Sequence, residues 1–100
     1  MAVYTSGDWH AKPGREQEFV DAWQELANWS GAEHDVGGWA KLLRDKEDPT
    51  HFRSVAEWAD DDTIQQWRAS EGFKQRMAKI RELLDDMHIY AMDVVAELQA

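Results

Sequence analysis

The 100-residue sequence contains no cysteine. A disulfide framework, a thiol nucleophile and a zinc site built on thiolates are therefore excluded. Basic residues are also scarce, with 11 Lys and Arg against 20 Asp and Glu and a formal net charge of −9. Nucleic acids and anionic membrane surfaces are bound by clustered cationic side chains, so neither is expected as a partner.

Several other signals are missing. The sequence has no long apolar run and no basic start of a signal peptide, so a cytoplasmic protein is the default expectation. It has no G-x-S-x-G motif, P-loop or G-x-G-x-x-G motif. Its four histidines lack both helical i, i+4 spacing and the His-x-Asp/Glu start of a facial triad. The run Asp60-Asp61-Asp62 is better placed to cap a helix than to hold one ion. We therefore predict no metal site and no cofactor.

The chain is rich in aromatic residues. Six are tryptophans, and 43% of all residues are hydrophobic, which is enough for a core in one domain over residues 1–100. Tryptophan is so large that it is rarely fully buried in a domain of this size. Several tryptophans are thus expected to line a cavity or a subunit interface.

Local patterns predict the secondary structure. Residues typical of strands occur within 1–10, 39–44, 52–58 and 88–98. Helical periodicity predicts one helix that ends at Ser30-Gly31, a short one through residues 64–67 and a third that Ser70 caps. The stripe expected to be buried on this third helix is Phe73, Met77, Ile80, Leu84 and Met87.

The element order is therefore β-α-β-β-α-(α)-β. It predicts an α+β fold of the ferredoxin-like, split βαβ type, an antiparallel sheet with helices on one face. Both faces of the later strands carry apolar residues. A second copy of the chain would cover the open face, so we expect a homodimer.

An aromatic-lined space between sheet and helices suits a flat apolar ligand. Three helices and one strand are expected to contribute apolar walls: Phe19, Trp23, Phe52, Trp58, Ile64, Trp67, Phe73 and Met77. Polar groups that are candidates to point into the space are Tyr4, His10, His51, Ser54 and His88.

Five segments resemble the antibiotic biosynthesis monooxygenase family: Lys12-Pro13-Gly14, Glu18-Phe19, Gly37-Gly38-Trp39, Glu57-Trp58 and the stretch 67–74, WRASEGFK. The resemblance implies a dimeric α/β barrel in which two ferredoxin-like sheets face each other. It also implies oxidation of polycyclic phenols or quinols by O2 without metal or flavin. Other members of the family degrade haem, and related ones are isomerases or have no assigned reaction.

The resemblance also points to particular positions. In the haem-degrading branch the residues are a tryptophan, matched by Trp67, a histidine, whose position is Met77, and an asparagine that falls near Gly7. In the quinone-forming branch Trp58 matches the tryptophan, whereas Ser54 takes the place of an asparagine. Ile64 stands where a tyrosine is expected.

These positions lead to three functional hypotheses. The first is a cofactor-independent monooxygenase that oxidises an aromatic or quinol-like small molecule with O2. Its candidate catalytic residues are Trp58 and Trp67, as indole N–H donors or stacking partners, Ser54 as a donor and His51 as a base. The alternatives are a non-catalytic small-molecule-binding dimer of the same fold and a haem-degrading monooxygenase.

Overall fold

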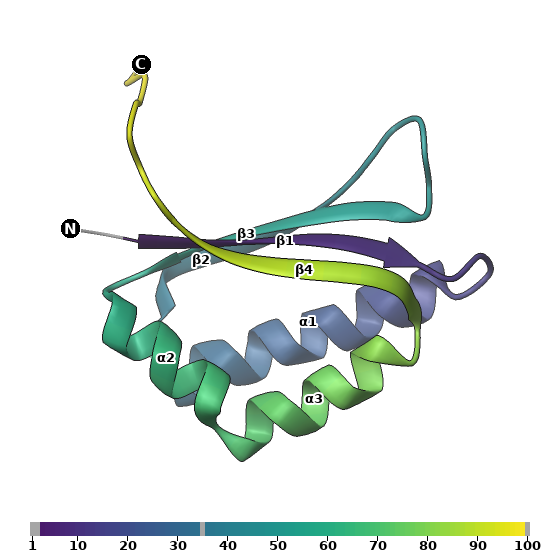
Figure 1. The fold of residues 1–100 in the computed structure, drawn as a ribbon, viewed down its shortest axis with the longest axis horizontal. Helices are drawn as coiled ribbons and strands as arrows, with labels where there is room; N and C mark the ends of the chain where they lie inside the picture. Colours follow the sequence, from purple (N-terminus) through teal and green to yellow (C-terminus); the bar gives the residue numbers. More distant parts are fainter. Residues whose placement is uncertain (1–2, 35, 100) are drawn as a thin grey trace.

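The computed structural model describes residues 3–34 and 36–99. Its elements follow the predicted order: β1 (Val3–Ala11), α1 (Glu16–Glu33), β2 (Val36–Arg44), β3 (His51–Trp58), α2 (Asp61–Ala69), α3 (Glu71–Arg81) and β4 (Leu84–Asp93). The strands pair antiparallel in the order β2-β3-β1-β4, and the three helices cover one face of the sheet (Figure 1). The prediction of a ferredoxin-like α+β fold is confirmed.

The central strand β1 shows why the sheet has two different faces. Its burial alternates residue by residue, since successive side chains of a strand point to opposite sides. The covered face, toward the helices, receives Val3, Thr5, Gly7, Trp9 and Ala11. The register pairs Trp9 with Phe52 and Val3 with Trp58, so β3 places its two largest aromatic side chains on the same face.

The two short helices begin at side-chain caps. Asp60 accepts a hydrogen bond from the Thr63 N–H at 2.8 Å, and Asp61 and Asp62 follow in the first turn of α2. Negative charge is favourable there because the backbone N–H groups of a helix N-terminus are unpaired. Ser70 caps α3 by accepting from the Phe73 N–H at 3.3 Å. Both predicted caps are confirmed.

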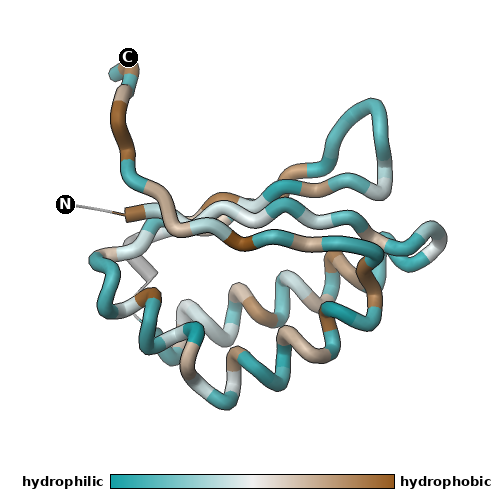
Figure 2. The backbone as a smooth tube through the Cα atoms, viewed as in Figure 1, coloured by the Kyte–Doolittle hydropathy of each residue, from teal (hydrophilic) through white to brown (hydrophobic). Residues whose placement is uncertain are grey.

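The core lies between the covered face and the helices. Figure 2 shows apolar residues recurring at intervals along otherwise polar helices. The side chains of Phe19, Phe52, Trp58 and Ile80 are at most 2% exposed. Burial of such a side chain contributes on the order of 1.5–3 kcal/mol, so this layer holds the helices on the sheet.

The predicted end of α1 was wrong. The helix does not stop at Ser30-Gly31 but continues to Glu33. The Ser30 hydroxyl donates to the Leu26 carbonyl at 2.7 Å, one turn earlier, so this serine bonds within the helix and does not end it.

The predicted limits of the last strand were also wrong. Strand β4 starts at Leu84 and ends at Asp93, whereas residues 88–98 were expected. Leu84 pairs with Ala11 on β1, so Leu84 and Met87 belong to the sheet and not to the stripe of α3. Asp93 pairs with Val3, the first described residue of β1, and the later residues find no strand to pair with in the described part of the chain.

The face of the sheet away from the helices, called here the outer face, is open in the single chain. Four large apolar side chains on it or at its edge are 41–52% exposed: Trp39, Leu43, Tyr90 and Met92. The segment after β4 and the β2–β3 loop rise on this side (Figure 1). Exposed apolar area of this extent on one side of a small domain is typical of an interaction surface.

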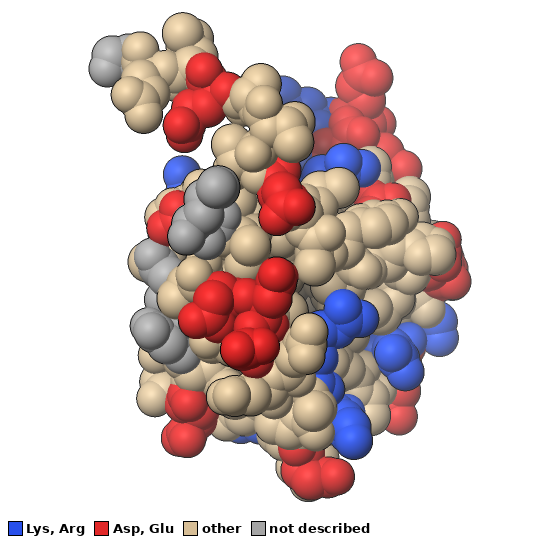
Figure 3. All heavy atoms as spheres, turned by 60° about the vertical axis from the view of Figure 1, so that its left-hand side comes forward, with Lys and Arg blue, Asp and Glu red and all other residues tan. Residues whose placement is uncertain are grey.

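The acidic composition appears at the surface as dispersed charge. In Figure 3 the Asp and Glu side chains form several separate groups with uncharged surface between them. No helix in the described ranges combines the length and the apolar composition needed to cross a membrane.

Candidate functional site

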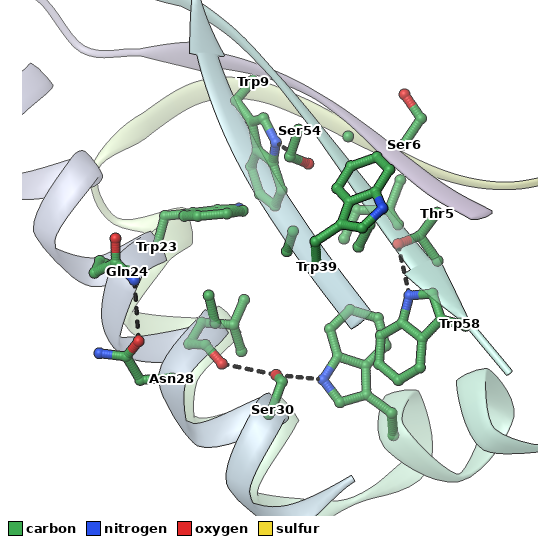
Figure 4. Close-up of a pocket in the computed structure, with 18 of the residues that line it drawn as sticks. Thr5, Ser6, Trp9, Trp23, Gln24, Asn28, Ser30, Trp39, Ser54 and Trp58 are labelled. Carbon is green, nitrogen blue, oxygen red and sulfur yellow. Dashed lines mark hydrogen bonds between the residues drawn. The ribbon is translucent and has the colours of Figure 1, made fainter. Parts of the chain in front are cut away.

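A cavity of about 370 Å³ lies between the covered face and α1 (Figure 4). This volume is at the lower end of the range for small-molecule pockets. The lining comes from β1, α1, β2, β3, α2 and β4: Thr5, Ser6, Gly7, Trp9, Trp23, Gln24, Leu26, Ala27, Asn28, Ser30, Gly31, Gly38, Trp39, Ala40, Ser54, Ala56, Trp58, Trp67 and Ile89. Helix α1 forms one long wall, and the sheet forms the other.

Three indole N–H groups of the lining donate to hydroxyl groups of the lining. Trp9 donates to Ser54 Oγ at 3.0 Å and Trp58 donates to Thr5 Oγ1 at 2.9 Å. Trp67 donates to Ser30 Oγ at 2.8 Å. Figure 4 shows the Trp9–Ser54 and Trp58–Thr5 pairs on the sheet side of the cavity and Ser30 on the helix side. Each tryptophan is thereby held in one orientation, because a buried indole N–H is costly without a partner.

The three hydroxyl groups differ in what remains available. Ser30 uses its proton on the Leu26 carbonyl, so it is both a donor and an acceptor already. Thr5 and Ser54 each accept an indole N–H, while no acceptor for their own protons lies among the described side chains. A hydroxyl that accepts a hydrogen bond becomes a better donor. Thr5 and Ser54 are therefore the hydroxyl donors that the sheet can offer to a ligand.

The absence of a side chain at Gly7 makes one of these pairs possible. A Cβ at this position would lie 2.5 Å from both Ser54 Oγ and Trp9 Nε1. Real Cβ atoms do not approach other atoms so closely, so any larger residue would displace the Trp9–Ser54 pair. The asparagine of the haem-degrading branch falls near Gly7, and this position has no room for an asparagine side chain.

The two tryptophans singled out by the sequence form the inner wall. Trp58 is 1% exposed and Trp67 is 7% exposed, and their ring centroids lie 4.7 Å apart. Phe73 packs against Trp67 at 4.5 Å between centroids. Little of either indole is accessible, and both N–H groups are occupied. In this structure they shape the cavity, and Ser54, which is half-buried, offers the more accessible polar atom.

Among the described residues that line the cavity there is no Asp, Glu, His, Lys or Arg. Its polar groups are hydroxyls, the indole N–H groups and the amides of Gln24 and Asn28. The cavity walls therefore supply hydrogen-bond donors but no group that changes its protonation near neutral pH.

The mouth of the cavity is polar on one side and aromatic on the other. Gln24 donates to Asn28 at 3.0 Å on the exposed surface of α1. Trp39, at 41% exposure, stands at the edge of β2. A shallow groove continues from here between α1 and β2, and it shares Trp23, Gln24, Ala27 and Ala40 with the cavity. A ligand longer than the cavity has room to extend along it.

Four of the predicted site residues line the cavity: Trp23, Ser54, Trp58 and Trp67. Five predicted pocket residues lie in the core without lining it: Phe19, Phe52, Ile64, Phe73 and Met77. They support its walls. Met77, which stands at the histidine position of the haem-degrading branch, is 3% exposed and buried in this core.

The remaining polar candidates lie on the outer face. Tyr4 donates to Glu57 Oε2 at 2.9 Å, and this hydrogen bond raises the pKa of the Tyr4 hydroxyl. His51 bonds to Asp8 at 2.6 Å, and its ring stacks on His10 at 4.5 Å between centroids. His10 and His88 are likewise absent from the lining. The sheet thus separates these groups from the cavity.

Charge pairing shifts the pKa values in this group. The Asp8 hydrogen bond, followed by that of Asp45, raises the pKa of His51 above its ordinary value. The same bond with His51 lowers the pKa of Asp8. The pair is therefore favoured as an imidazolium and a carboxylate, which is typical of a salt bridge at a partly exposed position.

The predicted site residues did not include Thr5 and Trp9, which complete the hydroxyl–indole pairs. A signal for both was present in the alternation of the first strand. Thr5, Gly7 and Trp9 have the same parity and so share a face. The parity of β3 likewise separates His51 from Phe52, Ser54 and Trp58.

The chain belongs to the antibiotic biosynthesis monooxygenase family, since a sequence profile of that family matches residues 3–79. The predicted resemblance is confirmed. A comparison with curated proteins found no match.

Solved structures show the same fold. The cofactor-independent oxygenase SnoaB from Streptomyces nogalater superposes with a TM-score of 0.88 at 19% identity, covering 99% of this chain and 98% of SnoaB. A conserved protein from Methanosarcina mazei Go1 has a TM-score of 0.77 at 24% identity, covering 90% and 91%. The Pseudomonas aeruginosa protein PA3566 has a TM-score of 0.79 at 21% identity, covering 95% of both chains.

Proposed function

We propose that this protein is a cofactor-independent monooxygenase that oxidises an aromatic, quinol-like small molecule with O2. Membership of the monooxygenase family and the fold shared with SnoaB, a cofactor-independent oxygenase, support the reaction class. The observation that carries the proposal is the cavity itself, which has aromatic walls, two free hydroxyl protons and no ionisable group among its described lining residues.

This lining limits the choice of substrate. With no base in the described walls, the substrate has to be acidic enough to ionise with little help, as quinols and anthrone-like phenols are. The Ser54 and Thr5 hydroxyls then donate to the oxygen that carries the negative charge, and they stabilise the anion. The closely packed tryptophans keep water away from it.

The chemistry balances without a further reactant. The ionised substrate gives its electrons to O2, and a carbon–oxygen bond forms at the activated carbon. The resulting peroxide takes up the released proton, its O–O bond breaks and water leaves. A CH2 group and O2 thus become a carbonyl group and one water. The protein's contribution is to bind, orient and desolvate the reactants.

We further propose that the active form is a homodimer joined through the outer face. The exposed apolar side chains on this face support the proposal, as does the barrel arrangement that the family resemblance implies. Both faces of each sheet would then be covered, which suits a chain of this size.

Oxygen uptake by chelator-treated protein with a panel of phenols, anthrones and quinols tests the reaction. We expect uptake of one O2 per carbonyl formed, at least tenfold slower in Ser54→Ala. Ser6→Ala is the matched control: Ser6 also borders the cavity, but its hydroxyl points to the other side of β1 (Figure 4). Tight binding without uptake for every compound would contradict the oxygenase and favour the binding protein.

A further inference from the structure

A cluster of two histidines and one aspartate stands on the outer face, away from the cavity. Asp8 and His10 are alternate residues of β1, and the register places His51 of β3 directly beside His10. Asp8 lies 2.6 Å from the Nε2 of His51 and 3.7 Å from the Nε2 of His10. One ligand atom of each residue lies within 4.8 Å of those of the other two.

A second carboxylate orients His51 from behind. Asp45 Oδ2 lies 3.2 Å from His51 Nδ1, which leaves Nε2 to face Asp8. Asp45 is itself held by the Glu47 N–H at 2.8 Å. Histidines that bind metals generally donate their second ring N–H to a carboxylate in this way, since the bond fixes the tautomer and the ring plane.

We propose that Asp8, His10 and His51 bind a divalent first-row transition metal ion such as Zn²⁺ or Co²⁺. Two imidazoles and one carboxylate are ligands that such ions prefer, whereas Mg²⁺ and Ca²⁺ prefer oxygen ligands alone. In the single chain the side chains are 25–40% exposed, so an ion reaches them from solvent where the proposed partner chain leaves this end of β1 uncovered. This site is additional to the proposed oxygenation, because it lies across the sheet from the cavity.

Binding requires two changes in the cluster. The stacked imidazole rings, 8° from parallel, tilt so that both Nε2 atoms point at the ion. The proton that His51 shares with Asp8 is released, so affinity rises with pH. Arg53, whose guanidinium lies 3.6 Å from Asp8, opposes the ion by charge repulsion and has room to turn outward because its side chain is 59% exposed.

Calorimetric titration of the full chain with Zn²⁺ tests the site, after treatment with a chelator and its removal. We expect one ion per chain, with at least tenfold weaker affinity in Asp8→Asn, His10→Gln and His51→Gln. Asp45→Asn is expected to weaken binding about 10- to 100-fold, as is usual for a residue that orients a metal ligand. His34→Gln is the matched control, since His34 packs on Trp29 and not in the cluster.

Two further measurements keep the result decisive. Circular dichroism checks that each variant is folded, and His10→Gln is the mildest, because this side chain is 40% exposed. Histidine ¹⁵N NMR is expected to show Zn²⁺ shifting the Nε2 signals of His10 and His51 and not those of His34. Unchanged affinity in the three ligand variants, or no Zn²⁺ binding by the parent chain, would overturn the proposal.

Discussion

The two faces of the sheet use their polar groups in opposite ways. On the covered face, neutral hydroxyls pair with buried indoles around a cavity without described ionisable groups. On the outer face, carboxylates pair with histidines, a tyrosine and an arginine at partly exposed positions. Side-chain alternation on β1 and β3 is sufficient to produce this difference.

The difference matters for chemistry. A carbanion that is to meet O2 has to be kept from water and acids, and neutral donors in a dry cavity do this at little desolvation cost. Groups that exchange protons or ions need access to solvent, which the cluster on the outer face has in the single chain. One strand of nine residues, β1, thus contributes to two unlike environments.

The largest expected effect is on the covered face. Trp58→Ala removes a side chain that is 1% exposed and leaves Thr5 without its donor. We expect a loss of about 3–5 kcal/mol in unfolding free energy, measured by urea denaturation. Leu98→Ala, at a position 93% exposed, is the control and is expected to change the stability by less than about 0.5 kcal/mol. A small loss in Trp58→Ala would mean that the inner wall is loosely packed.

The next effect concerns the apolar part of the outer face. Met92→Glu places a charge on the surface proposed to join two chains. We expect the dimer to be weaker by about 2–3 kcal/mol, so that its dissociation constant rises roughly 30- to 150-fold. Analytical ultracentrifugation over a range of concentrations measures it. Gln75→Glu, which adds the same charge on the helix side, should leave the assembly unchanged. A parent chain that sediments as a monomer contradicts the dimer outright.

A pair of glycine substitutions sharpens the account of the cavity. Gly7→Ala forces a Cβ against Ser54 and Trp9 and is expected to cost about 1–3 kcal/mol and to weaken ligand binding. Gly31→Ala has no atom within 4 Å of its new Cβ and lies in α1. Alanine is the better helix former, so this change is expected to stabilise by about 0.5–1 kcal/mol. If the glycine at position 7 were not constrained, thermal melts would show the melting temperature changing in the same direction in both variants.

The smallest effect is the pH dependence of the outer face. Since the pKa of His51 is raised by folding, its contribution is present below the unfolded pKa and is lost as pH rises through the folded pKa. The lowered pKa of Asp8 has the opposite effect: its contribution to stability is present above the unfolded pKa and is lost only as the pH falls into the acid range. With a chelator present, Asp8→Asn should reduce stability near pH 6 by at most about 1 kcal/mol and have less effect at pH 8–9. Equal losses at both pH values would contradict the salt bridge.

The sequence predicted the fold well because its signals are local and repeated. The caps at Asp60 and Ser70 and the apolar spacings each indicate one element, and these together limit the topology. The start of β4 was missed because Leu84 and Met87 continue the 4-3 spacing of α3 as well as they fit a strand. Only the pairing of Leu84 with Ala11 decides between the two readings.

The site was less accessible to sequence reasoning, because it depends on register. Trp23, Ser54, Trp58 and Trp67 were found among aromatic and polar candidates, but His51 was grouped with them although its parity on β3 differs. The cluster of His51 with Asp8 joins residues 43 positions apart, and no spacing within either strand reveals it. The Trp9–Ser54 and Trp58–Thr5 pairs likewise depend on the register between β1 and β3.

The central claim is that a small aromatic molecule binds on the covered face, among the indoles. Six tryptophans give six indole N–H signals in ¹⁵N-labelled protein, and five of these tryptophans line the cavity. On addition of an anthrone, we predict shifts for the signals of Trp9, Trp23, Trp58 and Trp67 and none for Trp29, which packs against Gly72 and Arg76. Unshifted signals for all four of these cavity tryptophans at a saturating anthrone concentration would contradict the account.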